Sequence, residues 1–225
     1  MREVHMQPKP NFARGLSFYK LFWVFTIGCV AGVLIENLWY LLAFHRITNR
    51  VGLVYGPFNP IYGMGALVIT VGLYWLRDKH WLWIFFGGVV LGSVFEYICS
   101  WVQEVVFGTV SWNYSHLPLN INGRINLVFS LFWGFVALLW TRYIYPGLSN
   151  LIERIPNRVG IVVTWALFAF LVYDILVSAA AVGRMSARHV GRPAANGVEA
   201  YLDEHFPDER LHEIYPSMKF VDTTK

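Results

Sequence analysis

Three glutamates lie inside long apolar stretches of the chain: Glu36, Glu96 and Glu104. An ionisable group at the centre of a bilayer costs about 2.5–3.5 kcal/mol on insertion scales, so it usually faces a protein interior or a water-filled cavity and acts there. Such a carboxylate can bind a proton, a cation or a cationic substrate, or serve as a general base. For Glu36 and Glu96 we favour a functional role over a structural polar contact. Glu104 is nearer a helix end, and a solvated interfacial position is an equal alternative.

The first two glutamates belong to a sequence pattern that occurs twice in the chain. Two glycines and one glutamate recur sixty positions apart, as Gly28, Gly32, Glu36 and then Gly88, Gly92, Glu96. A loop rich in Gly, Pro and Asn and a second apolar stretch follow each triplet. The repeat unit is therefore a helix, a polar loop and a helix, at about 20–77 and about 81–142. Because each unit contains two spans, both copies enter the membrane in the same direction.

The paired glycines predict a helix contact. Small residues four apart let helices approach closely in lipid. We expect the first and third helices to pack there, so that Glu36 and Glu96 face each other one turn further on and share a proton.

The two polar loops hold side chains that could orient a ligand. Their hydrogen-bond donors and cations are Arg50, Tyr55, Asn59, Tyr114, Asn120, Asn122 and Arg124. Such groups orient polar or anionic ligand atoms, while a nearby carboxylate accepts from a cationic part. With the three glutamates they form the predicted substrate- or ion-binding site. Ordinary turns and interfacial aromatic anchors are the alternative, above all for Tyr114.

The composition of the chain indicates that the segments carrying these residues lie in a membrane. Of 225 residues, 56% are hydrophobic and 14% charged, and the mean hydropathy is +0.45, which is typical of an integral membrane protein. Apolar stretches that approach the roughly 20 residues of a membrane span lie at roughly 20–44, 60–76, 81–107, 125–145 and 159–182; the second is short. We predict an all-α, polytopic membrane helical bundle of about five transmembrane helices, with a tandem two-helix repeat and a short C-terminal tail.

The distribution of Lys and Arg predicts the orientation. Nine of them lie in the N-terminal segment, in the turn at 77–79 and in 142–158, whereas the two polar loops hold three. The segment 1–19 is therefore expected in the cytoplasm and the loops outside. Five spans place the tail, 183–225, outside as well, but its arginines argue against that, so its side stays open.

Asp174 lies inside the last predicted span. We expect it to form an ion pair with Arg184 or Arg188 at the end of that helix.

The rest of the tail is acidic between Glu199 and Glu213. Apolar residues punctuate it at loosely helical spacing. A short amphipathic helix that docks on the membrane domain and a solvated tail are both consistent with this pattern.

Several chemistries are absent from the sequence. It has no phosphate-binding loop and no dinucleotide fingerprint, its histidines lack metal-site spacing, and Cys29 and Cys99 lie inside different spans. We expect neither a metal nor another cofactor. The formal net charge of +4 is explained by membrane orientation and requires no nucleic acid.

A family resemblance rests on several segments: Glu36, 55–63 (YGPFNPIYG), Glu96-Tyr97, Glu104, 112–115 (WNYS), 120–124 (NINGR) and 202–210 (LDEHFPDER). Together they resemble the bacterial family called putative ABC-transporter type IV, or CmpB-like ABC-transporter permeases, from about residue 20 onward. The resemblance implies a permease in the bacterial cytoplasmic (inner) membrane. The chain has no ATPase module, so the ATPase would be a separate subunit.

Two functions follow. The first is a small permease or transport subunit with a carboxylate-lined polar site near the outer face, surrounded by lipid and possible as a homo-oligomer. The alternative is a membrane-embedded enzyme acting on a lipid or lipid-linked head group, with a glutamate as general base and Arg50 or Arg124 holding a phosphate. The repeat favours transport, and a scaffold or regulatory protein is a third class.

Overall fold

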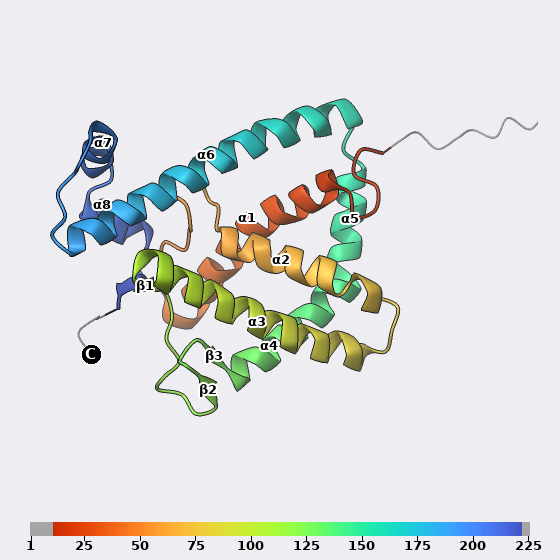
Figure 1. Cartoon of the computed structure of the whole chain (residues 1–225). Coiled ribbons are helices and arrows are strands. Elements are labelled where there is room, and N and C mark those ends of the chain that lie inside the picture. The colour runs from red at the N-terminus through yellow and green to blue at the C-terminus, as the bar shows by residue number, and fades with distance from the viewer. Residues whose placement is uncertain (1–10, 222–225) are drawn as a thin grey trace, which may run out of the picture.

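The computed structural model describes residues 11–221 and is built mainly from helices (Figure 1). Four helices are long and apolar enough to cross a membrane: α1 (Phe18–Phe44), α3 (Trp81–Phe107), the continuous helix Leu127–Glu153 and α6 (Asn157–His189). The helix α2 (Pro60–Gly72) is apolar but has 13 residues, which rise about 20 Å. The 3₁₀ turn η1 (Tyr74–Leu76) follows it. The predicted all-α membrane bundle is confirmed.

Asparagine caps fix where the two polar loops end. The side chain of Asn59 accepts from the backbone N–H of Ile61, and Pro60 occupies the first position of α2. Asn126 accepts from the N–H of Val128 in the same way at the start of the next helix. Each cap satisfies one of the backbone donors that a helix start leaves unpaired. The loops therefore deliver α2 and α4 into the bundle at defined residues.

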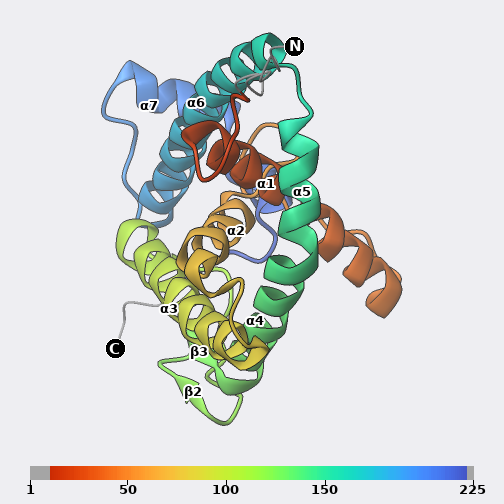
Figure 2. The same cartoon turned by 90° about the vertical axis from the view of Figure 1, so that its right-hand side faces the viewer.

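The helix after the second loop bends. It consists of α4 (Leu127–Leu139), a π-helical turn η2 (Trp140–Ile144) and α5 (Tyr145–Glu153). In Figures 1 and 2, α5 turns away from α4 and runs across the end of the bundle beside the start of α1. The wider π turn and Pro146, which has no backbone N–H, account for the bend. The sequence predicted the span 125–145 but not α5 as a separate surface helix.

A fully buried lysine holds α5 against α1. The Nζ of Lys20 donates to the Ser149 carbonyl at 3.0 Å and lies 2.6 Å from Glu153 Oε1. Glu153 is 35% exposed, so water also reaches this pair.

The two long loops and the C-terminal tail gather at one end of the bundle, which we call the loop end (Figure 1). The start of α1, the turn at 77–80 and α5 lie at the opposite end, the α5 end. Two short antiparallel ladders also lie at the loop end: β1 (Thr109–Val110) with β4 (Lys219–Phe220), and β2 (Asn120–Ile121) with β3 (Ile125–Asn126). The ladder of β1 and β4 ties the tail to the second loop.

The tail is docked, which decides between the two alternatives for its acidic part. It forms α7 (Gly197–His205) and α8 (Asp208–Ile214). Leu202, Phe206 and Leu211 are buried against Ala181 and Met185 of α6. The helix α6 also extends seven residues past the predicted end at 182, because the tail neutralises the two arginines that follow.

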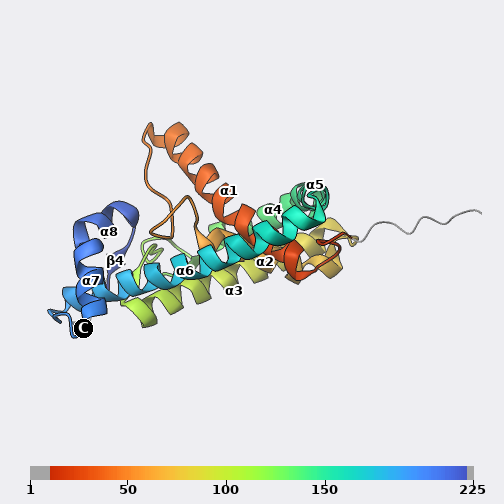
Figure 3. The same cartoon turned by 90° about the horizontal axis from the view of Figure 1, so that it is seen from above.

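The C-terminal half of α1 leaves the bundle (Figures 2 and 3). Leu38, Trp39 and Leu42 are 54%, 63% and 68% exposed there. Lipid tails solvate such side chains, so no protein partner is needed to cover them.

The glycine pairs pack differently from the expectation. A Cβ on Gly28 would lie 3.0 Å from the Ala66 methyl of α2, and one on Gly88 would meet Ala137 of α4. Each first helix therefore packs closely on the second helix of its own pair, and the expected glycine contact between the first and third helices is wrong. In Figures 1 and 2, α2 lies between α1 and α3.

Candidate functional site

Glu36 is held by one residue of α2 and one of the first loop. The Tyr62 hydroxyl donates to its Oε2, and Arg50 Nε lies 3.4 Å from its Oε1. The Arg50 guanidinium also stacks 3.9 Å over the Tyr40 ring and donates to the Ser217 hydroxyl at 2.6 Å. Glu36 is thus a neutralised carboxylate, and its arginine links α1 to the tail.

Glu96 has a different environment. The Tyr114 hydroxyl donates to its Oε1 at 2.8 Å, and the Trp133 Nε1 donates to its Oε2 at 3.2 Å. Burial, and then the Glu96 charge, raise the pKa of Tyr114 well above its usual value, so its hydroxyl stays a donor. Within residues 11–221 no Lys or Arg pairs with Glu96. It is a carboxylate in a membrane helix with neutral donors only.

Glu104 pairs with Arg124, which lies near the end of the second loop. Arg124 donates to Glu104 Oε2 at 2.6 Å and to the Ser100 hydroxyl at 3.1 Å. These three residues line a cavity of about 100 Å³, together with Val110, Trp112, Asn113, Asn122, Gly123 and Val221. That volume holds roughly three waters at about 30 Å³ each. The cavity suits a small ion or a few waters rather than a bulky solute.

The remaining predicted site residues shape the loops. Asn59 caps α2 and donates to the Arg50 carbonyl at 3.0 Å. Asn120 closes a turn by accepting from the Gly123 N–H at 2.9 Å. Asn122 has a positive φ of 53° and donates to the Tyr97 hydroxyl at 2.9 Å. Of these, Asn122 alone lines the cavity of about 100 Å³.

Tyr55 lies against the tail. Its ring packs at 6.3 Å from Phe206, edge to face, and burial raises the pKa of its hydroxyl. Its backbone N–H donates at 3.2 Å to Asp174. Tyr55 therefore joins the first loop to α6 and the tail and has no contact with the three glutamates in the interactions of residues 11–221.

The expected contact between Glu36 and Glu96 rested on the packing of α1 against α3. Gly28 and Gly32 face α2, and Gly88 and Gly92 face α4, so the packing of α1 on α3 that would bring the two glutamates together is not present. The two carboxylates share no hydrogen-bond or ion-pair partner in the described part of the chain. They are two separately held groups at the loop end.

The predicted ion pair of Asp174 is also wrong. Arg184 pairs with Glu199 and Asp203, and Arg188 with Asp203 and Asp208, all in the tail. The docked tail brings Glu199, Asp203 and Asp208 to the helix end, whereas Asp174 lies roughly three to four turns back along α6.

Asp174 is instead completely buried and has no cationic partner among residues 11–221. Its Oδ1 accepts from Tyr55 N and from the Ser178 hydroxyl at 3.3 Å, and its Oδ2 is unpartnered. The hydroxyl of Tyr215 is also buried, with Ser178 as its neighbour, and burial raises its pKa to about 12.

Sequence reasoning missed the donors that hold the glutamates from the second helices. Tyr62 binds Glu36 and Trp133 binds Glu96, and the same two side chains face Gly32 and Gly92. The contacts place Gly63 and Gly134, 71 positions apart, at matching points opposite the glycines of α1 and α3. The first helices repeat at an offset of sixty positions and these contacts at 71, so the register of the second helices could not be read from the glycine and glutamate pattern.

No group of three His, Cys, Asp or Glu side chains gathers as metal ligands among residues 11–221. The fold and the polar loop end define a multi-pass α-helical membrane protein with ionisable groups inside its helices. The chain belongs to the family described as putative ABC-transporter type IV, whose model matches residues 23–179. No curated protein and no solved structure matches this chain.

Proposed function

We propose that this protein is the membrane subunit of a small-solute transport system, with its binding site at the loop end. The family description supports a transport-related role. The observation that carries the proposal is Glu96, which lies in a spanning helix and accepts two hydrogen bonds from neutral donors, Tyr114 and Trp133. A carboxylate without a fixed cation is available for a proton or a cationic solute.

The other predicted residues have supporting roles in this proposal. Glu36 and Arg50 brace α1 against the first loop, while Glu104, Asn122 and Arg124 line the small cavity in the second. The enzyme alternative needs Arg50 or Arg124 to hold a phosphate. Both arginines pair with glutamates, and this favours transport over lipid chemistry.

We also propose that the two helix pairs are copies of one unit, spanning about 20–77 and about 81–142. Three pairs of residues, each 71 positions apart, make matching contacts with the first helices, which supports the proposal: Tyr62 and Trp133, Gly63 and Gly134, Ala66 and Ala137. Such duplication is common in transporters.

The proposed location is a bacterial inner membrane, with the α5 end in the cytoplasm. The partition of Lys and Arg supports this orientation. In a cysteine-free background, cysteines placed at Asn49 or Ser115 should react with an impermeant thiol reagent on intact cells, and one at Lys79 should not. The reverse labelling pattern would invert the site.

The chain has no nucleotide-binding motif of its own, so transport powered by ATP requires a separate ATPase. The surface we propose for it is the turn at 77–80 and the segment 142–158, which carry exposed basic residues at the α5 end. Pull-down in mild detergent followed by mass spectrometry should recover an ATPase. Recovery of the protein alone, active in vesicles without nucleotide, would leave a stand-alone transporter.

The central experiment tests Glu96. Proteoliposomes that contain the protein with any copurified ATPase receive gradients of protons, Na⁺ and K⁺ in turn, and the flux is measured with ion-sensitive dyes. Glu96→Gln keeps the shape and removes the charge, so we expect at least about a tenfold loss of flux. Glu209→Gln, an exposed acid of α8, is the matched control and should transport normally. Wild-type flux in the Glu96→Gln variant would refute the proposal.

A further inference from the structure

A second cavity lies at the α5 end, opposite the loop end that holds Glu36, Glu96 and Glu104 (Figure 1). It has a volume of about 190 Å³ and lies between the end of α2, the η1 turn, the π turn η2 and α5. Its lining consists of Thr70, Leu73, Tyr74, Arg77, Trp140, Thr141, Tyr145, Pro146, Ser149 and Asn150. We call it the π-turn pocket. A π turn inside an α-helix frequently marks a functional site.

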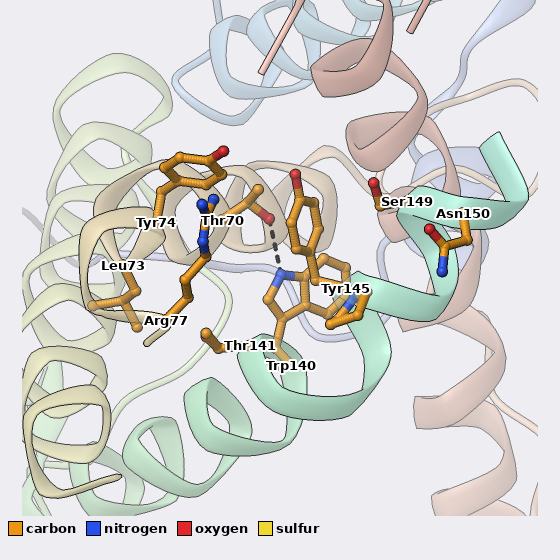
Figure 4. Close-up of a pocket in the computed structure, with 10 residues that line it drawn as sticks. Thr70, Leu73, Tyr74, Arg77, Trp140, Thr141, Tyr145, Ser149 and Asn150 are labelled. Atoms are coloured by element: carbon orange, nitrogen blue, oxygen red, sulfur yellow. Dashed lines mark hydrogen bonds between the residues drawn. The ribbon is translucent and has the colours of Figure 1, made fainter. Parts of the chain in front are cut away.

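The lining is rich in hydrogen-bond donors and contains no carboxylate. Figure 4 shows the hydroxyl ends of Tyr74 and Tyr145 on the same side of the pocket as the Arg77 guanidinium. The Arg77 guanidinium stacks 3.9 Å over the Tyr74 ring, which fixes its orientation. One cation with several hydroxyl donors and no acid selects an anion with several acceptor oxygens.

The one acid bound to Arg77 competes weakly. Asp78 accepts from Arg77 Nε at 3.2 Å, but its side chain is 86% exposed and lies outside the pocket lining. An ion pair of such exposure contributes little. Arg77 therefore remains available to an anion in the pocket.

The surroundings of the pocket match the depth of lipid head groups. Trp75 of η1 and Tyr143 of η2, two elements that line the pocket, are 81% and 74% exposed. Trp and Tyr concentrate at the interface between the bilayer and water. An anion bound beside them lies at the level of lipid phosphates, with apolar helix surface next to it for acyl chains.

The size of the pocket fits this ligand. A volume of about 190 Å³ corresponds to roughly six waters at about 30 Å³ each. That is enough for a phosphodiester with a small head group, whereas the acyl chains would stay outside along the helices.

We propose that the π-turn pocket binds the phosphate of an anionic phospholipid, with Arg77 as the cation and the hydroxyls of Tyr74 and Tyr145 as donors. The site joins α2, η2 and α5, so an occupied pocket ties the bent helix to the first helix pair. The inference is independent of the proposed Glu96 site, because it concerns other residues at the opposite end of the bundle. It shares the turn at 77–80 and part of the segment 142–158 with the proposed ATPase surface, and its test in detergent uses lipid binding and requires no ATPase.

The test is native mass spectrometry of the full chain in mild detergent, with three probes. Phosphatidylglycerol has phosphate and tails, diacylglycerol has tails alone, and glycerol phosphate has phosphate alone. We expect one tightly bound phosphatidylglycerol and at least about tenfold weaker binding of the other two probes. Equal binding of glycerol phosphate would overturn the lipid as the source of the phosphate. Equal binding of diacylglycerol would overturn the phosphate site itself.

Variants assign the site to its residues. Arg77→Gln should weaken phosphatidylglycerol binding about tenfold, the size of one lost charge-assisted hydrogen bond, and Tyr145→Phe should weaken it a few-fold. Arg158→Gln removes an equally charged, exposed residue at the same end that does not line the pocket, and it should change binding less than about twofold. Because Arg77 is 44% exposed, its replacement leaves the core intact. Equal losses for Arg77→Gln and Arg158→Gln would show diffuse attraction and overturn the assignment.

Discussion

The close contact between α3 and α4 can be tested by adding one methyl group, with the substitution Gly88→Ala. A Cβ added at Gly88 would lie 3.1 Å from the Trp133 carbonyl oxygen and 3.2 Å from Gly134 Cα, and it would come closer still to the Ala137 methyl. Carbon atoms in favourable contact are about 3.5–4.0 Å apart. Because backbone atoms block the new methyl group, Gly88→Ala can be accommodated only if the two helices separate.

The magnitude follows from two opposing effects. Overpacking a well-packed interior costs about 1–3 kcal/mol, and replacing a helical glycine by alanine returns up to about 1 kcal/mol. We expect Gly88→Ala to lose about 1–2 kcal/mol of unfolding free energy. For a chain of this size that lowers Tm by about 2–8 °C.

Two matched substitutions calibrate the effect. Gly183 in α6 has nothing within 4 Å of its added Cβ, so Gly183→Ala should raise Tm slightly through helix propensity alone. Gly28→Ala is intermediate, because its nearest neighbour is the Ala66 methyl at 3.0 Å. Thermal unfolding in one detergent, followed by circular dichroism, ranks the three variants. A Tm of Gly88→Ala equal to or above wild type, with Gly183→Ala as expected, would refute the packing of α3 on α4.

Two further predictions concern the tail and α5. Hydrogen bonds from Arg184, and then those from Arg188, lower the pKa of Asp203 below its ordinary value, so its contribution to tail docking is complete above about pH 4 and is lost as pH falls below that value. The protection factors of the α7 amides, which compare each exchange rate with the intrinsic rate at the same pH, should therefore stay constant from pH 8 to about pH 5 and fall only in stronger acid. In Asp203→Asn they should be lower already at pH 7. Glu153→Gln leaves the Lys20 ammonium buried without a counterion and should cost about 3 kcal/mol, the lower end for a buried pair, because water reaches the partly exposed partner. Lys20→Met leaves a carboxylate that is 35% exposed and should cost less. The opposite order of Tm values would contradict the buried pair.

Local signals in the sequence predicted the long helices, but not the two short ladders of the loops or α5. Hydropathy located the membrane helices, because a span must be apolar along its whole length. Asn59, Pro60 and Asn126 stand where α2 and α4 begin, since a cap acts on backbone donors within three residues. The acidic pattern of the tail allowed a docked helix, but it allowed a solvated tail equally well.

The partners of the polar groups could not be predicted in this way. Glu96 binds Trp133, 37 positions away, and Glu36 binds Tyr62 of the neighbouring helix. Asp174 accepts from the backbone N–H of Tyr55 and does not pair with Arg184 or Arg188, which lie roughly three to four turns beyond it on the same helix. Each outcome depends on which helices lie side by side.

What the sequence by itself determined is the class of protein: the membrane helices, their caps and the carboxylates inside them. What only the tertiary structure decided is the pairing of these elements, with Gly28 against Ala66 and Gly88 against Ala137. In lipid, apolar burial does not distinguish one helix neighbour from another, so the choice depends on close packing at small residues and on a few hydrogen bonds between helices. Those contacts join residues far apart in the chain, and neither the periodicity nor the composition of the sequence predicts them.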